Sequence, residues 1–227
     1  MKPLVIVFAK DPAPGRVKTR LGAAIGLTPA AELYSAMVTD LLEMLMREGG
    51  AWDIEIHLDR DSFFYERFPL PKALQVGNGL GEKIFASLSN GLARGAPMVT
   101  VIGSDAPVMR TAWLTQLAEC GADVALGPAE DGGFWGIRAA RTYAGMFDGV
   151  RWSTETALAD TLAGLAKAGL SSALGPAGWD VDVASDLDRL VRSGCAGPRT
   201  ATMLTRLGIK EGGEPAGSYL PAGSPRD

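Results

Sequence analysis

The chain contains very little histidine and cysteine. Of its 227 residues, one is histidine, His57, and two are cysteines, Cys120 and Cys195. Two cysteines form neither a disulfide framework nor a Cys-based zinc site, so we expect free thiols in a reducing compartment. A single histidine excludes a His-rich metal site and disfavours a Ser-His-Asp triad. We interpret His57 as a surface residue on the outer side of a strand, without a catalytic role.

The sequence also lacks an excess of positive charge and any long apolar run. Its formal net charge is −4, whereas a nucleic-acid-binding protein needs a broad basic face. No 18 apolar residues follow one another without interruption, and the apolar start at 4–7 is too short for a signal peptide. We therefore expect a cytoplasmic protein with small-molecule partners, no bound nucleic acid and no membrane span.

The order of apolar segments and glycine-rich turns predicts the fold class. Four apolar runs are strand candidates, at 4–7, 54–58, 98–102 and 123–127. Stretches with helical spacing come between them, and repeated strand-loop-helix units are typical of α/β proteins. We predict a Rossmann-like, open, mostly parallel sheet with helices on both faces. A single domain is expected over 1–210, followed by a flexible Gly-, Pro- and Ser-rich tail over 211–227.

A basic loop follows the first expected strand. It combines prolines and Gly15 with four cationic side chains, Lys10, Arg16, Lys18 and Arg20. A turn from a strand into a helix aims backbone N–H groups at one point, and full positive charges there can hold a di- or triphosphate. A solvated basic loop without a ligand is the alternative interpretation.

A second glycine-rich turn precedes another helical stretch. The segment 77–83 reads Gly-Asn-Gly-Leu-Gly-Glu-Lys, and apolar residues at helical spacing follow it. Such clusters often mark turns and nothing more. In a sheet wound in the usual right-handed way, this turn would lie beside the basic loop.

Asp105 follows the expected central strand at 98–102. A carboxylate just beyond the carboxyl end of a buried strand lies at the ligand-binding edge of an α/β sheet. Mg²⁺ or Mn²⁺ fits such a position, held by one or two carboxylates and by phosphate oxygens. Capping of the next helix is the alternative role for Asp105.

Asp180 and Asp182 form a second pair of acids. They alternate along an extended stretch, so both side chains would lie on one face, and either could bind the same ion as Asp105. The competing interpretation is structural: Asp182 or Ser185 would cap the helix that begins near 184.

The run Glu130-Asp131-Gly132-Gly133 combines acids with glycines. Glycines permit a close approach of the backbone to a ligand, while the acids could bond sugar hydroxyls or act as a base. A plain β-turn is the alternative. Phe134, Trp135 and Trp152 would suit an acceptor pocket, although tryptophan is also common in protein cores.

Taken together, these blocks resemble a known family. The chain resembles the GT-A-like transferases associated with radical-SAM and selenodomain gene contexts, described as arsenosugar-biosynthesis-type glycosyltransferases. The likeness extends from Lys2 to about Leu207, and four ordered blocks carry it, at 8–21, 79–83, 103–107 and 127–133. The resemblance implies the nucleotide-diphospho-sugar transferase fold, which glycosyltransferases share with nucleotidylyltransferases. The latter usually carry several glycines where this chain has Pro12 and Pro14.

The resemblance also implies roles for individual residues. Gly15, Arg16 and Lys18 would hold phosphates, and Gly79 and Gly81 would lie near the nucleoside. The predicted site then consists of catalytic Asp131, Arg16 and Lys18; metal-binding Asp105 and Asp182; and substrate-binding Lys10, Gly15, Arg20, Gly79, Gly81, Glu82, Lys83, Gly132, Gly133 and Trp152.

The leading hypothesis is a metal-dependent glycosyltransferase with a nucleotide-sugar donor and a small-molecule acceptor. Arg16, Lys18 and the ion would neutralise the diphosphate leaving group, and Asp131 would act on the acceptor. The alternative is a nucleotidylyltransferase, in which a phosphorylated acceptor attacks the α-phosphate of a nucleoside triphosphate. A third hypothesis is a nucleotide-binding protein without catalysis. The sequence identifies neither the base, sugar and acceptor nor the oligomeric state.

Overall fold

The computed structural model describes residues 1–48 and 50–210. The tail expected at 211–227 lies outside these residues. Contacts divide the chain into two compact units. Unit 1 comprises Met1–Asp11 and Leu41–Asp180, and unit 2 comprises Pro12–Asp40 and Val181–Asp227. The expectation of a single domain stays a prediction.

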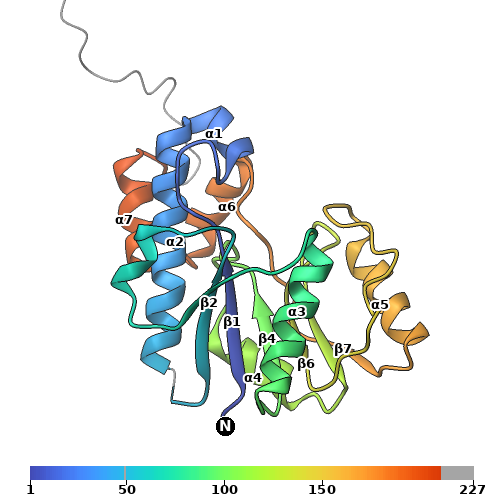
Figure 1. Cartoon of the computed structure of the whole chain (residues 1–227). Helices are drawn as coiled ribbons and strands as arrows, with labels where there is room; N and C mark the ends of the chain where they lie inside the picture. The colour runs from blue at the N-terminus through green and yellow to red at the C-terminus, as the bar shows by residue number, and fades with distance from the viewer. Residues whose placement is uncertain (49, 211–227) are drawn as a thin grey trace, which may run out of the picture. The chain divides into compact units, whose positions relative to one another are not determined.

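Unit 1 is built on a seven-stranded sheet (Figure 1). Across the sheet the strands are β3 (Lys72–Leu74), β2 (Asp53–Leu58), β1 (Leu4–Ala9), β4 (Val99–Ile102), β6 (Phe134–Ala139), β5 (Val124–Pro128) and β7 (Ser172–Leu174). Strand β6 runs antiparallel to β4 and β5, and the other pairings are parallel. The predicted mostly parallel sheet is therefore confirmed.

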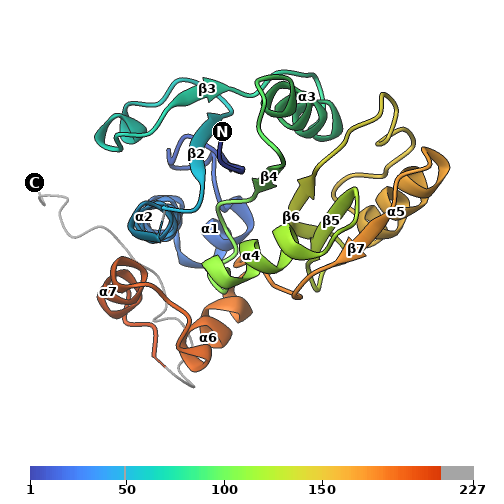
Figure 2. The same cartoon turned by 90° about the horizontal axis from the view of Figure 1, so that it is seen from below.

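The central strands are buried on both faces, as their apolar sequences require. Strand β1 reads LVIVFA and is almost wholly inaccessible, because parallel strands are covered by helices on each side. Helices α3 (Leu80–Ala93) and α5 (Ala157–Lys167) contribute to the core on one face, through Leu88 and Leu165. Helix α4 (Thr111–Glu119) lies on the other face, so that α3 and α4 flank the sheet in Figure 2. Helices on both faces are thus confirmed.

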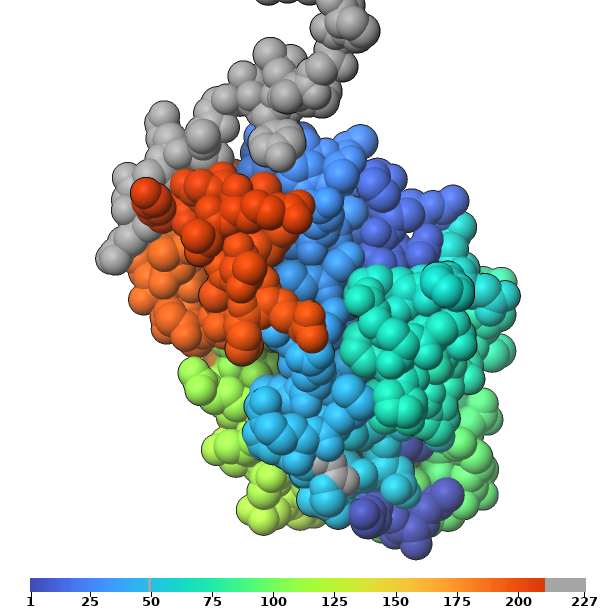
Figure 3. Space-filling view, turned by 90° about the vertical axis from the view of Figure 1, so that its left-hand side faces the viewer, coloured from blue at the N-terminus to red at the C-terminus, as the bar shows by residue number. Residues whose placement is uncertain are grey.

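The segment between β2 and β3 anchors the end of β1. It contains the 3₁₀ turn η1 (Phe63–Arg67), which forms part of the surface drawn in teal in Figure 3. The Tyr65 hydroxyl donates to the carbonyl of Lys10 at 2.8 Å. Asp11 receives the Ser62 hydroxyl at 2.6 Å, and its own N–H donates to Asp59 Oδ1 at 2.9 Å. These bonds fix the start of the basic loop.

Unit 2 is helical. It contains α1 (Thr19–Ile25), the first part of α2 (Leu27–Glu48), α6 (Ala184–Ser193) and α7 (Pro198–Arg206). Asp40 on α2 receives the backbone N–H groups of Arg199 and Thr200 at 3.0 and 2.8 Å. This carboxylate satisfies donors that the first turn of α7 would otherwise leave unpaired.

His57 is buried, so its interpretation as a surface residue is wrong. Its exposed fraction is 8%, because α3 covers the face of β2 on which it lies. Nδ1 lies 2.9 Å from the Ser87 hydroxyl, Nε2 lies 3.3 Å from Glu55 Oε2, and the ring stacks on Phe8. Burial lowers the pKa of His57, although Glu55 acts in the opposite direction.

The expectation of free thiols agrees with the structure. Cys120 and Cys195 are both free thiols. Among the described residues, no helix has the length and apolar character that crossing a membrane would require.

Candidate functional site

A pocket of about 230 Å³ opens in unit 1 at the end of the sheet where β1 and β4 finish. Phe8, Ile102 and Gly103 line it from the ends of these strands. Because β6 is antiparallel, its first residue, Phe134, reaches the same edge. The carboxyl edge of parallel strands is where α/β proteins bind their ligands, which makes this pocket the candidate site.

The polar groups of the pocket are hydroxyls and carboxylates. Ser153 and Thr154 supply the hydroxyls, while Asp131 and Asp180 supply the carboxylates. The other lining residues are apolar, aromatic or glycine, and none of those in the described part of unit 1 is lysine, arginine or histidine. Such a lining offers hydrogen-bond acceptors and apolar surface, but no positive charge for an anion.

A tight turn between β5 and β6 carries Asp131. The turn closes through Gly132 N–H, which donates to Ala129 O at 3.1 Å, and Gly133 N–H donates to Asp131 Oδ1 at 2.9 Å. Gly132 has φ +85°, and a Cβ there would lie 1.9 Å from the carbonyl oxygen of Glu155. The close approach predicted for this glycine is therefore made by the protein's own backbone. Asp131 is exposed and, with Gly133, lines the pocket.

Trp152 forms one wall of the pocket. Its ring meets Phe134 and Phe147 edge to face, with centroids 5.9 and 5.7 Å apart. A Cβ on Gly81 would lie 3.0 Å from the Trp152 indole, so this glycine makes room for the ring. Trp135 also lines the pocket; it contacts Trp113, and its Nε1–H donates to a backbone carbonyl at 2.9 Å.

The glycine-rich turn at 77–83 begins helix α3. Gly79 is the N-cap residue, and Glu82 Oε2 receives the backbone N–H of Asn78 at 2.8 Å. Glu82 is exposed and Lys83 is half-buried. The neighbouring Leu80 and Ile84 line the pocket, whereas the four predicted residues of this block, Gly79, Gly81, Glu82 and Lys83, do not.

The acids of unit 1 lie near the same edge. The Asp105 carboxylate lies close to Gly103: a Cβ placed on Gly103 would be 3.1 Å from Asp105 Oδ1. Helix α4 begins only at Thr111, so the alternative role of Asp105 as its cap is wrong. Asp180 lines the pocket directly.

In unit 2, two predicted site residues bond to each other. Lys18 Nζ lies 2.8 Å from Asp182 Oδ1, and the Lys18 side chain is only 4% exposed. Asp182 and Val183 both donate their N–H groups to Asp186 Oδ2 at 2.8 Å. Asp186 therefore satisfies the start of α6, and the alternative that Asp182 or Ser185 is its cap is wrong.

The other predicted site residues of the basic loop are exposed. Gly15 has φ +78°, and Arg16 N–H donates to Ala13 O at 3.0 Å, which defines a turn before α1. Arg16, Arg20 and, in unit 1, Lys10 present their side chains to solvent. This exposure is compatible with phosphate binding and also with the alternative of a solvated loop.

The predicted metal ligands belong to different units. Asp105 is in unit 1 and Asp182 in unit 2, so a shared ion stays a prediction. Within the described residues, no cluster of three or more His, Cys, Asp and Glu is arranged to hold a metal. The sequence prediction missed several pocket residues, among them Phe8, Ser153 and Thr154. Their positions, at the end of the first strand and directly after Trp152, were the available signals.

Comparisons with known proteins define the family. Residues 60–154 match a family described as an uncharacterized protein conserved in bacteria (DUF2064). A crystal structure from Desulfovibrio desulfuricans G20, provisionally assigned as a nucleotide-diphospho-sugar transferase, matches with 30% sequence identity and a TM-score of 0.80. The match covers 91% of this chain and 95% of that one. The chain therefore belongs to the nucleotide-diphospho-sugar transferase family, and its enzyme class is transferase.

More distant structures share the fold. The inositol-1-phosphate CTP transferase from T. maritima has a TM-score of 0.55 at 12% identity, over 90% of this chain and 96% of that chain. A cytidylyltransferase from Leptospira borgpetersenii has a TM-score of 0.55 at 8% identity, over 94% and 98%. No curated protein matches the sequence.

Proposed function

We propose that this transferase is a glycosyltransferase of the GT-A type, which moves a sugar from a nucleotide donor to a small-molecule acceptor. The lining of the pocket carries the proposal. A sugar ring presents hydroxyl donors and an apolar C–H face, which match the Asp131 and Asp180 carboxylates and the Trp152 ring. The sugar of the donor would bind in this pocket.

The same lining disfavours the nucleotidylyltransferase alternative. That reaction needs a phosphorylated acceptor, whose negative charge would enter a pocket that already holds two carboxylates. Two like charges about 4 Å apart repel by about 4 kcal/mol near a protein surface. A neutral hydroxyl-bearing group meets no such penalty, so the pocket favours glycosyl transfer.

The roles of the remaining residues follow from charge. Asp131 would accept the proton of the attacking hydroxyl, and Arg16 and Lys18 would neutralise the departing diphosphate. Asp105 and Asp182 offer the oxygen ligands that Mg²⁺ and Mn²⁺ prefer, and such an ion would add positive charge at the leaving group. An ion on Asp182 would share this carboxylate with Lys18, which bonds to Oδ1.

Ligand-induced thermal stabilisation tests the donor class. The panel contains nucleoside diphosphates, triphosphates and nucleotide sugars, each with and without Mg²⁺ or Mn²⁺. A ligand at 100 times its dissociation constant adds about 2.7 kcal/mol to the free energy of unfolding. We expect nucleotide sugars to stabilise more than the matching diphosphates, because only they fill the pocket. Stabilisation by triphosphates only would favour nucleotidylyl transfer, and no response at all would refute the proposal.

An Asp131→Asn variant separates catalysis from binding. We expect nearly normal stabilisation by the nucleotide sugar, because the amide oxygen still accepts a hydrogen bond from a sugar hydroxyl, and a large loss of nucleoside diphosphate release, since the amide cannot act as a base. Asp61→Asn is the matched control, because Asp61 is also an exposed acid of unit 1 but does not line the pocket. Unchanged turnover in Asp131→Asn would remove Asp131 from the mechanism.

A further inference from the structure

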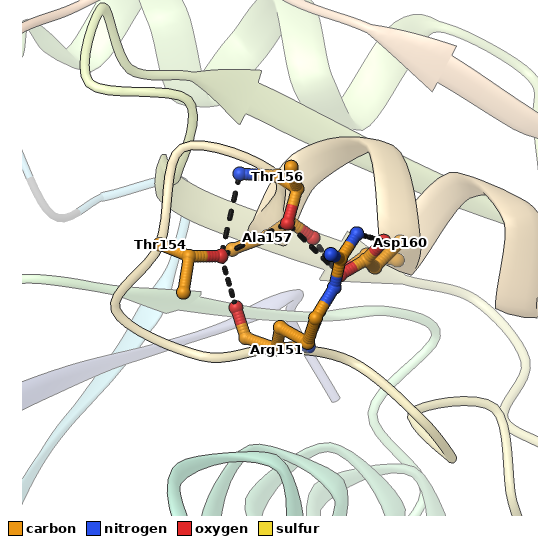
Figure 4. Close-up of polar contacts among 6 residues, drawn as sticks. Arg151, Thr154, Thr156, Ala157 and Asp160 are labelled. Atoms are coloured by element: carbon orange, nitrogen blue, oxygen red, sulfur yellow. Dashed lines mark hydrogen bonds and ion pairs between the residues drawn. The ribbon is translucent and has the colours of Figure 1, made fainter.

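Arg151 and Asp160 form a pair just outside the pocket: Arg151 directly precedes Trp152, and Asp160 lies in the first turn of α5 (Figure 4). Arg151 Nε and one terminal nitrogen donate to Asp160 Oδ2 and Oδ1, both at 2.9 Å. The backbone N–H of Arg151 adds a third bond to Oδ2 at 3.1 Å. Because the guanidinium fork matches both carboxylate oxygens, the pair fixes the orientation of the two side chains as well as the distance between them.

Two threonines complete the arrangement. Thr156 Oγ1 donates to Asp160 Oδ2 at 3.1 Å, and Thr154 Oγ1 donates to the carbonyl of Arg151 at 2.7 Å. The hydrogen bonds from Arg151, and to a lesser extent from Thr156, lower the pKa of Asp160 to about 2. The Asp160 carboxylate is therefore ionised throughout the neutral range. We call these four residues, Arg151, Thr154, Thr156 and Asp160, the clasp.

The clasp encloses a disfavoured backbone conformation. Ser153 has φ +61°, a left-handed conformation that residues with a Cβ seldom adopt. Such a conformation persists only where neighbouring bonds hold it in place. Ser153 lies between Trp152 and Thr154 on the pocket wall, so the bonds of the clasp keep this strained wall in position.

The same segment supports the turn that carries Asp131. Leu158 N–H donates to Gly132 O at 2.9 Å. The backbone of Glu155 packs so closely on Gly132 that no Cβ would fit between them. A shift of the clasp would therefore move the Trp152 wall and the Asp131 turn together.

We propose that Arg151 and Asp160 are positioning residues which set the spacing between the Trp152 wall and Asp131, and so determine which sugar the pocket accepts. The proposal rests on the proposed function, because it assumes that a sugar occupies the pocket. The Arg151 side chain is 65% exposed, and exposed ion pairs contribute little to global stability. Four hydrogen bonds on one surface carboxylate are explained better by local order beside the pocket.

Asp160→Asn and Arg151→Lys test the proposal in the full-length protein. The first removes the charge, and the second keeps the charge but loses the fork. Arg94→Lys is the matched control for the second variant. Arg94 makes a two-pronged pair with Glu55, at 2.7 and 2.9 Å, and neither of these residues lines the pocket.

The first measurement is amide hydrogen exchange of the ligand-free proteins. We expect faster exchange in peptides covering 151–158 and 129–133 in Asp160→Asn, a smaller change in Arg151→Lys, and no change at these sites in Arg94→Lys. Faster exchange confined to 151–158 would overturn the proposal, because the Asp131 turn would then be independent of the clasp. This result does not depend on the nature of the substrate.

The second measurement compares two dissociation constants, for the nucleotide sugar that most stabilises the wild type and for its nucleoside diphosphate. In Asp160→Asn, a displaced Trp152 wall should weaken binding of the nucleotide sugar about tenfold and leave binding of the nucleoside diphosphate nearly unchanged. Equal effects on both ligands, or on neither, would overturn the positioning role. If the wild type binds no nucleotide sugar, the proposed function fails, while the exchange measurement still decides whether the clasp holds the pocket.

Discussion

Arg138 is a buried cation that completes the end of a helix, and replacing it should destabilise unit 1 strongly. Its exposed fraction is 1%, and it lies on β6 facing α4. Nε donates to Leu117 O at 2.8 Å, and one terminal nitrogen donates to Ala122 O at 2.7 Å. The other terminal nitrogen lies 2.8 Å from Cys120 Sγ. The guanidinium thus pairs one carbonyl in the last turn of α4, that of Leu117, and one in the segment that follows the helix, that of Ala122.

The magnitude follows from these bonds. A hydrogen bond to a charged group contributes about 1.5–3 kcal/mol, and Arg138→Met removes two short ones while it keeps the apolar stem. Burying a cation without a carboxylate is itself costly, and its removal offsets part of the loss. We expect a net decrease of about 2–4 kcal/mol in the free energy of unfolding, because two carbonyls lose their donor. The melting temperature should fall by about 5–15 °C.

Urea and thermal denaturation measure this effect, with Arg141→Met as the control. Arg141 is also near the end of β6, but its side chain is 69% exposed and bonds Asp123 at 3.2 Å. Its loss should cost less than about 1 kcal/mol. Arg138→Lys should recover part of the stability, since one ammonium can reach one of the carbonyls. If Arg138→Met were as stable as the Arg141 variant, the carbonyls would have other partners and the reasoning would be wrong.

Three further predictions concern the turn, the buried histidine and the ion. Gly132→Ala should lower both melting temperature and turnover, because its Cβ would overlap the Glu155 carbonyl; Gly149→Ala, at φ +79° with open space around it, should leave turnover unchanged. Because burial lowers the pKa of His57, the unfolded chain takes up a proton before the folded one. Unfolding free energy should therefore fall as pH drops below about 6.5, and His57→Gln should flatten this dependence in pH-resolved denaturation. Asp105→Ala should abolish any stimulation of turnover by Mg²⁺ or Mn²⁺, and metal dependence identical to the wild type would exclude Asp105 as a ligand.

The strands that the sequence predicts are those whose burial comes from their own apolar side chains. The runs at 4–7 and 98–102 are central and covered on both faces, so their composition suffices. Strand β6 was not predicted, because Gly136 and Arg138 interrupt its apolar pattern. Arg138 can be buried because carbonyl groups of Leu117, in α4, and Ala122, beyond it, receive its hydrogen bonds, and no local pattern indicates those partners.

The residues of the candidate site also fall into those that the sequence predicts and those that depend on distant partners. Asp131, Gly133 and Trp152 were predicted from their motifs and line the pocket. Thr154 was not predicted, because its position depends on a loop that Arg151 closes onto a residue nine positions away. The roles proposed for the basic loop and the metal ligands depend on residues of both units and stay predictions.

The glycine-rich blocks lie at the candidate site, but their glycines make room for other parts of the protein and not, as was predicted, for a ligand. Gly81 and Gly132 were predicted to admit a ligand, but the groups that approach them are the Trp152 ring and the Glu155 backbone. A glycine signals that something comes close to the backbone, and the sequence does not say whether that group is a ligand or another part of the chain. In this protein both approaches build the walls of the pocket. The motif therefore marks the right region, since a wall held this closely can present Asp131 to a substrate in a fixed geometry.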